Sequence, residues 1–134
     1  MSRLVTDQGF GPVPALPFVG LDQIASHRGA LDLAQTDAPE AALPYLADLA
    51  CIRIAFPSVA DGRGFTLARR LRALGFSGTL RAQGAIIADQ YAMARRSGFD
   101  EVEIPQAMAD RQPQEQWLAR ANWQAHDYQS RLRA

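Results

Sequence analysis

Short apolar runs alternate along this chain with amphipathic stretches, a pattern typical of strands joined by helices. Four strands are predicted, over residues 30–34, 51–56, 79–83 and 102–104. Enough residues separate each strand from the next for one helix, so neighbouring strands should run parallel with right-handed crossovers. The predicted fold class is therefore α/β, in β-α-β-α-β-α-β order. A small three-layer domain and a barrel-like fragment both satisfy this order.

Three helices are predicted between these strands, over residues 39–50, 65–74 and 85–97. Gly75 and Gly98 should end the second and third, because glycine accepts the left-handed conformation found at helix C-termini. Each precedes a phenylalanine, and the 23-residue offset between the two Gly-Phe pairs indicates a weak internal repeat. Thr36 or Asp37 should cap the first helix, and Pro44 should kink it or mark the start of its regular part.

The two ends of the chain are patterned differently from its middle. Glycines and prolines interrupt residues 1–29, so we expect a loosely ordered N-terminal arm there, with a short strand at 18–21. A single α/β domain is expected over 30–134. Pro113 can begin a C-terminal helix that docks an apolar stripe on the sheet, formed by Trp117, Leu118, Ala121, Ala125, Tyr128 and Leu132. Trp123 falls on the opposite side of that helix, where it is either a lone exposed residue or a contact with a partner or second copy.

Composition narrows the classes of function. The 134 residues carry 14 basic and 14 acidic side chains, so charge gives no case for a nucleic-acid or membrane-surface binder. Every basic residue is arginine, which excludes a Schiff-base lysine and a P-loop lysine. The single cysteine, Cys51, excludes an internal disulfide, and its apolar surroundings indicate a buried thiol. A cytoplasmic location is expected, because neither a membrane span nor a signal peptide is recognisable.

Metal and redox centres have no support in the sequence. His27 and His126 are far apart and lack metal-ligand spacing, so no metal site is expected. There is no nucleotide or flavin fingerprint and no cysteine cluster for an iron–sulfur centre, so no cofactor is expected either. Any electron transfer would have to be supplied by a partner protein.

The main candidate site is the turn formed by Asp61, Gly62, Arg63 and Gly64, between a strand and a helix. Glycines there allow a tight turn with exposed N–H groups, and the helix N-terminus adds partial positive charge. With the Arg63 guanidinium, such a turn can hold a small oxyanion. The alternative is a structural turn in which Asp61 and Arg63 pair with their neighbours.

Four more polar residues are candidates for the same site. Arg81 and Gln83 lie on the next strand, where a central arginine requires a carboxylate partner such as Asp61 or Asp89. By helical phase Gln90 falls on a buried stripe, so its amide either locks the helix to the sheet or orients a ligand. Asp61 and Asp89 are also the candidates for a general base if the protein is an enzyme.

A further set of arginines lies on the second and third predicted helices: Arg69, Arg70, Arg72, Arg95 and Arg96. Such residues usually form a solvated face of a helix. A docking surface for an acidic carrier protein is the less common interpretation of the same spacing.

The motifs around the candidate turn resemble a bacterial family, the domain of unknown function 934. The shared residues are Phe56-Pro57, Asp61 to Thr66, Ala68-Arg69, Leu71-Arg72, Gly75-Phe76, Gly78, Leu80-Arg81-Ala82, Gly84, Asp89-Gln90 and Gly98-Phe99-Asp100. Members often carry the label of an oxidoreductase involved in sulfite reduction. The resemblance therefore implies a role in assimilatory sulfur metabolism, without implying any particular catalytic residue.

One position departs from the family pattern. Members often have an acidic residue after the glycine of the second strand in this region, whereas this chain has Ala85. Loss of that carboxylate would impair the protein if it takes part in chemistry, and would matter little if it only caps a helix.

Three functions remain open from the sequence. The first is an accessory protein of sulfite reduction that binds a small oxyanion or a sulfur-pathway partner at the Asp61–Gly64 turn, with Arg63, Arg81, Gln83 and Gln90 around it. The second is an enzyme that uses the same pocket for acid–base chemistry. The third is a dimeric scaffold or adaptor that works through the C-terminal helix.

Overall fold

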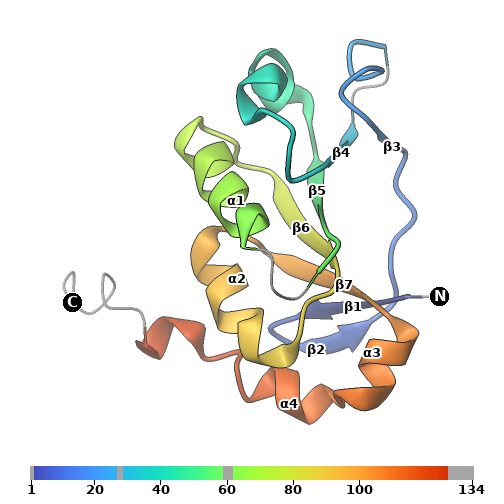
Figure 1. Ribbon diagram of the computed structural model, residues 1–134, viewed down its shortest axis with the longest axis vertical. Coiled ribbons are helices and arrows are strands. Elements are labelled where there is room, and N and C mark those ends of the chain that lie inside the picture. Colours follow the sequence, from blue (N-terminus) through green and yellow to red (C-terminus); the bar gives the residue numbers. More distant parts are fainter. Residues whose placement is uncertain (1, 27–28, 59–61, 127–134) are drawn as a thin grey trace.

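A computed structural model describes residues 2–26, 29–58 and 62–126, which form a mixed α/β structure around one seven-stranded sheet (Figure 1). The strands are β1 (Ser2–Thr6), β2 (Gly9–Gly11), β3 (Phe18–Val19), β4 (Ala30–Leu33), β5 (Cys51–Phe56), β6 (Thr79–Gly84) and β7 (Glu101–Pro105). Their order across the sheet is β2-β1-β7-β6-β5-β4-β3. The predicted α/β class is confirmed.

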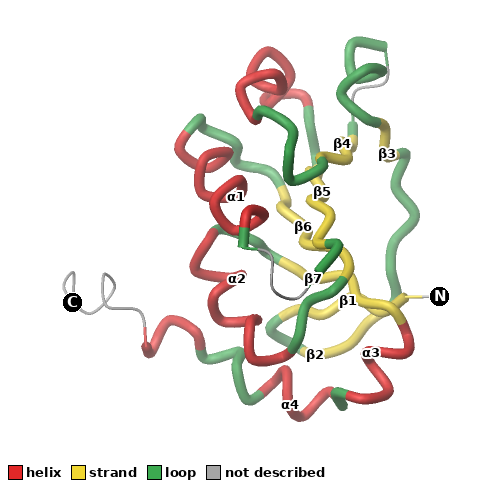
Figure 2. Tube along the Cα trace, in the orientation of Figure 1, coloured by secondary structure: helices red, strands yellow, loops and turns green. Residues whose placement is uncertain are grey.

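The helical segments are η1 (Pro39–Asp48), α1 (Arg63–Ala73), η2 (Ala88–Gln90), α2 (Tyr91–Ser97), α3 (Gln106–Arg111), α4 (Gln114–Leu118) and η3 (Trp123–His126). Figure 2 shows α1 and α2 side by side along the sheet, with α3 and α4 near the β1–β2 end. Gly75 and Gly98 follow α1 and α2 with φ of 103° and 115°, so the left-handed C-terminal conformations predicted for both helices are present.

The four predicted strands are the parallel core of this sheet, and they follow one another in consecutive order from β4 to β7. Right-handed crossovers in consecutive order place every connecting helix on the same face. The apolar core accordingly lies between that face and the helices, with alternate strand residues such as Ile52, Leu80 and Val102 fully buried. Because the strand order never reverses among these four strands, the carboxyl ends of β4 to β7 offer no switch-point crevice of the doubly wound kind.

Residues 2–19 differ from the loose arm that the sequence predicts. β1 and β2 form an antiparallel hairpin, and β1 also pairs with β7, with Arg3 opposite Ile104. The predicted strand at 18–21 is β3, a two-residue strand parallel to β4. Residues 12–17 join β2 to β3 at the other edge, and Figure 1 shows this connection on the side of the sheet away from α1 and α2. The sheet thus includes residues on both sides of the expected boundary at residue 29.

The first predicted helix is a 3-10 helix with different capping. Its N-cap is Ala38, which makes no side-chain capping bond, so neither Thr36 nor Asp37 has the predicted role. Asp37 instead accepts a hydrogen bond from the Ala34 amide at 2.8 Å and holds the turn after β4. Pro44 lies inside η1, and the lack of an N–H on proline favours this irregular helix over an α-helix.

The C-terminal segment packs less regularly than the single predicted helix. Trp117 on α4 is 1% exposed, and its ring contacts the Tyr91 ring edge-on at 6.1 Å. Leu118, predicted on the same buried stripe, is 39% exposed. Trp123 is half-buried, with the Arg95 guanidinium 4.8 Å from the centre of its ring. The remainder of the predicted stripe, from Tyr128 onward, lies outside the described residues.

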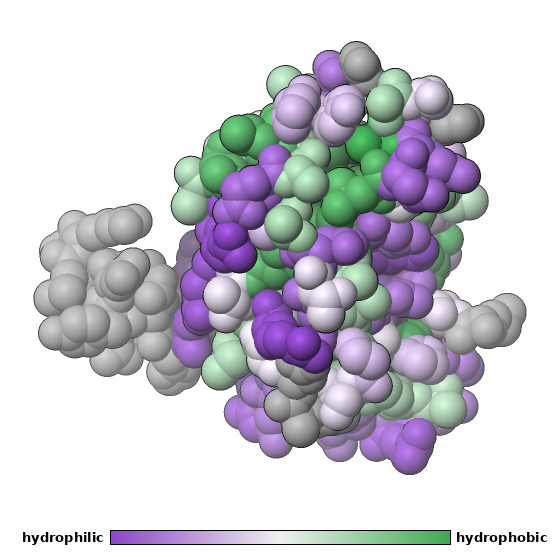
Figure 3. Space-filling view, turned by 45° about the horizontal axis from the view of Figure 1, so that its top comes forward, coloured by the Kyte–Doolittle hydropathy of each residue, from purple (hydrophilic) through white to green (hydrophobic). Residues whose placement is uncertain are grey.

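Apolar side chains on the surface gather toward one end of the molecule, while hydrophilic side chains cover most of the rest of the face in Figure 3. Among the residues that the structure describes, the large exposed apolar ones are Leu16, Leu43, Met93 and Leu118. They come from four different segments, so they do not form one helical stripe. None of the helices in the described part of the chain combines the length and apolarity needed to cross a membrane.

Candidate functional site

A groove lies between the turn that follows β4 and the first turns of α1, which are neighbours in Figure 1. One half of it, the Arg70 half, has a volume of about 210 Å³ and is lined by Gln35, Asp37, Arg63, Thr66, Leu67 and Arg70. The other, the Ala55 half, has a volume of about 240 Å³ and is lined by Ala34, Gln35, Thr36, Ala55, Pro57 and Arg63. Gln35 and Arg63 line both halves, so the two lie next to each other.

The N-terminus of α1 contributes partial positive charge to this groove, which is also lined by Asp37, Arg63 and Arg70. Its N-cap is Gly62, which supplies no side-chain cap, and no acidic residue lies in the first turn. The exposed Arg63 is the first helical residue, so a guanidinium adds to the partial positive charge of the helix end. The partial positive charge of a helix N-terminus can stabilise a bound anion.

Packing beneath Gly64 fixes where α1 begins. A β-carbon at Gly64 would lie 2.3 Å from the Phe56 ring, so only glycine allows the helix to rest on this ring. Phe56 in turn contacts the rings of Phe65 and Phe99, with centroids 5.0 and 5.7 Å away. The aromatic cluster anchors the first turn of α1 at the carboxyl end of β5 and thereby positions Arg63 beside the groove.

Gln35 is the most unusual residue of the groove. Both polar atoms of its amide are buried, and neither has a hydrogen-bond partner. Buried amides are almost always hydrogen-bonded, because leaving a polar atom unpaired costs roughly 1–3 kcal/mol. Sequence reasoning missed this residue, since a glutamine in a turn carries no signal until its surroundings are known.

The structure keeps part of the predicted site and separates the rest. Gly62, Arg63 and Gly64 lie at the start of α1, beside the groove. Asp61 lies outside the described residues. Arg81 is not brought to the groove, because its side chain extends from the face of the sheet opposite α1, alternating with the core residues Leu80 and Ala82.

Arg81 belongs to what we call the sheet-face cluster, formed by Asp32, Arg53, Arg81, Glu101 and Glu103. Arg81 is 1% exposed and binds the Glu103 carboxylate at 3.0 Å, with Glu101 3.7 Å from its Nε. The sequence predicted Asp61 or Asp89 as the acidic partner of Arg81. The prediction for Asp89 is wrong, because the acidic partners of Arg81 are these two glutamates on β7. A cross-strand neighbour explains this, since Arg81 pairs in register with Glu101.

The rest of the sheet-face cluster is closed by ion pairs and by β3. Arg53 donates to both oxygens of Asp32 at 2.6 and 2.9 Å and to Glu103 at 3.3 Å. The Phe18 ring lies over Arg53 at 4.0 Å and over Arg81 at 5.4 Å. Burial raises the pKa of Glu101, and the opposing charge of Arg81 only partly offsets this effect. These contacts give the cluster a structural role in covering the sheet.

The remaining candidates lie around β6 and the turn that follows it. Gln83 is half-buried and stands in register with Ala55, which places it one strand from the groove. Asp89 is 72% exposed at its side chain and pairs with Arg120 at 2.7 Å, in a different pocket from the groove. Gln90 accepts a hydrogen bond from the Ile87 amide at 3.0 Å and so closes the η2 turn.

Ala85 follows the last residue of β6, at the position where the family pattern often has an acidic residue. Its amide donates to the Phe56 carbonyl at 2.9 Å. The N-cap of the next helical segment, η2, is Ile87. A side chain at position 85 therefore does not stand at a helix cap, so capping is not what an acidic residue would do there.

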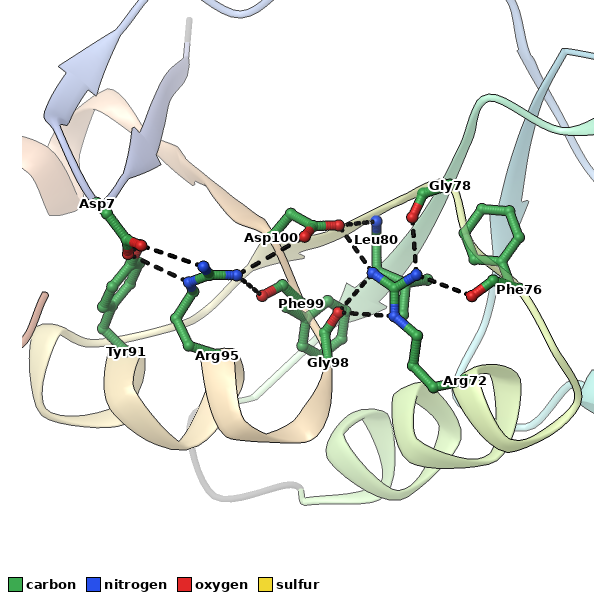
Figure 4. Close-up of polar contacts among 10 residues, drawn as sticks. All are labelled: Asp7, Arg72, Phe76, Gly78, Leu80, Tyr91, Arg95, Gly98, Phe99 and Asp100. Carbon is green, nitrogen blue, oxygen red and sulfur yellow. Dashed lines mark hydrogen bonds and ion pairs between the residues drawn. The ribbon is translucent and has the colours of Figure 1, made fainter. Parts of the chain in front are cut away.

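Two arginines of the predicted basic surface have structural roles instead (Figure 4). Arg72 donates to the carbonyls of Phe76, Gly78 and Gly98 at 2.8–3.1 Å and to the Asp100 carboxylate at 2.8 Å. This guanidinium joins α1 to the loop before β6 and to the end of α2. Arg69, Arg70 and Arg96 remain exposed, so the predicted continuous basic face is interrupted.

Arg95 repeats this arrangement one unit later in the chain. It donates to the Phe99 carbonyl at 2.6 Å, as Arg72 does to Phe76, in both cases four residues along. The weak Gly-Phe repeat is therefore an Arg-x-x-Gly-Phe repeat in which the arginine closes the helix end. Arg95 also binds Asp7 at 3.1 Å, so it fastens the β1–β2 hairpin to α2.

Metal binding finds no support in the part of the chain that the structure describes, where no group of three or more His, Cys, Asp or Glu side chains could hold an ion. Cys51 is buried, and burial raises the pKa of its thiol to about 11. A thiol with this pKa is a poor ligand and a poor nucleophile at neutral pH.

These features define a mixed α/β domain with consecutive parallel strands and a groove beside its first α-helix that Arg63 and Arg70 line. Residues 30–134 match the model of a family described as "Bacterial protein of unknown function (DUF934)", and the chain belongs to this family. The resemblance seen in the sequence is thereby confirmed at the level of the family. No curated protein and no solved structure gives a significant match.

Proposed function

We propose that this protein binds a small oxyanion in the groove between the β4 turn and α1, and acts as an accessory protein of sulfite reduction. The anion would lie against the first turn of α1, with Arg63 supplying paired donors. The observation that carries the proposal is the N-terminus of α1, which has a guanidinium at its first position and no acidic residue in its first turn. Sulfite and sulfate are the oxyanions that the sequence resemblance favours.

Other residues of the groove support the same ligand chemistry. Thr66 supplies a hydroxyl and Arg70 a second guanidinium. Arg70 is already paired with Glu40 at the surface, so its contribution is long-range attraction rather than a dedicated contact. Compared with the site expected from the sequence, Gln35 and Thr66 replace Arg81 and Gln90 as the residues around the anion.

Calorimetric titration with sulfite, sulfate and phosphate tests this proposal, using the wild type and an Arg63→Gln variant. Arg69→Gln is a matched control, because Arg69 is exposed on the same helix and does not line the groove. We expect at least one anion to bind the wild type and the control, and the Arg63 variant to bind it roughly tenfold more weakly or worse. The absence of binding by all three anions, or equal binding by both variants, would rule the site out.

The role in sulfite reduction needs its own measurement. Sulfide production from sulfite in extracts that lack this protein should recover when the wild type is added, and should recover less with Arg63→Gln. Recovery that is equal with both proteins would separate the pathway role from the groove. Asp61→Asn and Asp89→Asn variants in the same assay test the alternative of an acid–base enzyme.

A further inference from the structure

A second pocket, which we call the α2 pocket, lies between α2 and the residues that follow α4. Figure 1 shows this part of the chain beside α2. The pocket has a volume of about 330 Å³, within the range of about 300–1,000 Å³ found for small-molecule sites. One wall consists of Asp89, Ala92 and Arg96, and the other of Ala119, Arg120, Asn122 and Trp123. These residues are all different from those that line the groove.

Two polar contacts join the walls of the α2 pocket. Arg120 pairs with Asp89 at 2.7 Å, and Arg96 donates a hydrogen bond to the Trp123 carbonyl at 3.0 Å. Asp89 and Arg96 are seven residues apart on the first wall, which corresponds to two helical turns or about 10 Å. A guanidinium group therefore lies at each end of the pocket.

The charged residues of the α2 pocket favour an anionic ligand. Arg96 and Arg120 are cations, and Asp89 is the one acidic residue among the described residues that line the pocket. Arg120 and Asp89 are 50% and 72% exposed at their side chains, and surface pairs of this kind are weak. The printed partner of Arg96 is a carbonyl, which uses one of its five N–H groups and leaves its charge without a carboxylate in the described part of the chain. A ligand carboxylate can supply that partner through paired hydrogen bonds.

Trp123 adds an aromatic surface next to Arg96. The Arg95 guanidinium lies over the half-buried Trp123 ring, 4.8 Å from its centre. Arg95 is not among the lining residues, so the pocket meets a part of the indole that Arg95 leaves uncovered. Met93 is 49% exposed and, by helical spacing, lies on the same face of α2 as Arg96. A planar ring gains from both neighbours, because aromatic rings pack well against indole and against the polarisable sulfur of methionine.

From these contacts we infer that the α2 pocket binds a small carboxylate that bears a planar ring. The carboxylate lies on Arg96 and the ring packs against Trp123, since the hydrogen bond between these two residues holds them side by side. Asp89 and Arg120 form the other end of the pocket, where the Asp89 carboxylate opposes a bound anion. This site is independent of the oxyanion proposed for the groove.

Nuclear magnetic resonance of the nitrogen-labelled full chain tests the inference, because the two tryptophans give two indole N–H signals. Trp117 is an internal control, since it is 1% exposed and its indole N–H donates to the Gln112 carbonyl at 2.9 Å. The probes are benzoate, benzamide and cyclohexanecarboxylate, which differ in charge or in ring planarity. We expect benzoate to move the Trp123 signal and not that of Trp117. Benzoate should also bind about tenfold tighter than uncharged benzamide, and several times tighter than cyclohexanecarboxylate.

Four variants assign the binding to the α2 pocket. Arg96→Gln should weaken benzoate about tenfold, and Ala119→Phe should abolish binding because it fills the pocket from an exposed position. Asp89→Asn should have the opposite effect, about threefold tighter binding, because it removes the opposing carboxylate and releases Arg120. Arg69→Gln is the matched control, an exposed arginine outside the pocket, and should stay within about twofold of the wild type. All four positions are exposed, so urea unfolding should show that each variant keeps its fold.

Several outcomes would overturn the inference. A Trp123 signal that benzoate does not move, or equal affinities for benzoate and benzamide, would exclude an anion site beside this ring. Unchanged affinity in Arg96→Gln, or weaker binding by Asp89→Asn, would show that the charges of the pocket do not act as described. The groove is tested separately through Arg63, so failure here leaves the proposed function untouched, and failure there leaves the α2 pocket untouched.

Discussion

Replacing Arg72 by methionine should destabilise this protein substantially. Arg72 is only 27% exposed at its side chain and spans three carbonyl groups and one carboxylate. Hydrogen bonds from a charged donor contribute about 1.5–3 kcal/mol each when buried. Partial exposure lets water replace some of them, so we take about 1 kcal/mol for each carbonyl and expect a loss of about 3 kcal/mol.

This loss is large for a domain of this size. The free energy of unfolding of such domains is roughly 5–15 kcal/mol, so the variant would lose a substantial share of it. The melting temperature should fall by about 10 °C. Urea denaturation followed by circular dichroism measures the change, and the slope of the transition should stay constant because the same surface is exposed on unfolding.

Two further variants make the measurement specific. Arg69→Met removes an exposed arginine from the same helix and should change the unfolding free energy by less than about 0.5 kcal/mol. Arg72→Lys keeps the charge beside Asp100, but a single ammonium cannot reach carbonyls on both sides, so it should recover less than half of the loss. If Arg72→Met proves as stable as Arg69→Met, the guanidinium does not fasten α1 to α2 in the way described.

Three other outcomes follow from the described contacts. The Cys51 thiol, with its pKa near 11, should stay unreactive toward a disulfide reagent at about pH 8 until urea unfolds the chain, and rapid reaction of the folded protein would contradict its burial. Burial raises the pKa of Asp7, but hydrogen bonds from Tyr91 and Arg95 outweigh it and hold that pKa below 3.8. The contribution of Asp7 to the free energy of unfolding should therefore be complete above that pH and be lost as the pH falls further. In urea denaturation at a series of low pH values, an Asp7→Asn variant should lose less unfolding free energy on acidification than the wild type. Gly84→Ala should lower the melting temperature markedly, since φ is 121° there and the new β-carbon would lie 2.5 Å from a backbone oxygen of β5; an unchanged melting temperature would refute the close approach.

Much of the parallel core could be predicted, because its strands and helix ends are determined by residues close together in the sequence. Cys51–Phe56 is a strand with the predicted bounds, since its alternating apolar residues face the helices. Gly75 and Gly98 end their helices as predicted, because the left-handed conformation is a local property of glycine. Periodicity and glycine positions together were enough to give the β-α-β-α-β-α-β order along the chain, whereas the order of strands β4 to β7 across the sheet comes from the structure.

The parts that were missed depend on partners far away in the chain. Nothing in the glycine-rich stretch around Gly9 and Gly11 indicates that a hairpin there would pair with β7. Arg81 was expected to find an acidic partner, and it does, but its partners could not be identified without the pairing of β6 and β7, which places Glu101 opposite Arg81 and Glu103 two residues further along the same strand. The sequence predicts Arg72 as a solvent-exposed helix residue, because its partners are backbone carbonyls of other segments, and a sequence does not show which carbonyls a side chain will meet.

The candidate site, too, could be predicted only in part. Arg63 at the start of a helix was visible in the turn motif, since a strand–glycine–helix junction is local. Gln35 was not, because the importance of its amide comes from being enclosed without a partner. Whether Arg63 and Arg81 share one site depends on which face of the sheet each side chain leaves, and the even spacing of strand residues assigns Arg81 to the far face.

Because β1 pairs with β7, the sheet cannot be completed during synthesis until β7 has left the ribosome. Arg3 emerges early, but its cross-strand neighbour Ile104 follows about one hundred residues later. At roughly 5–20 residues per second, the leading hairpin waits on the order of ten seconds with one edge unpaired. The nascent chain is therefore most exposed to wrong strand pairing during this interval, and a circular permutant that moves the hairpin behind β7 would shorten it.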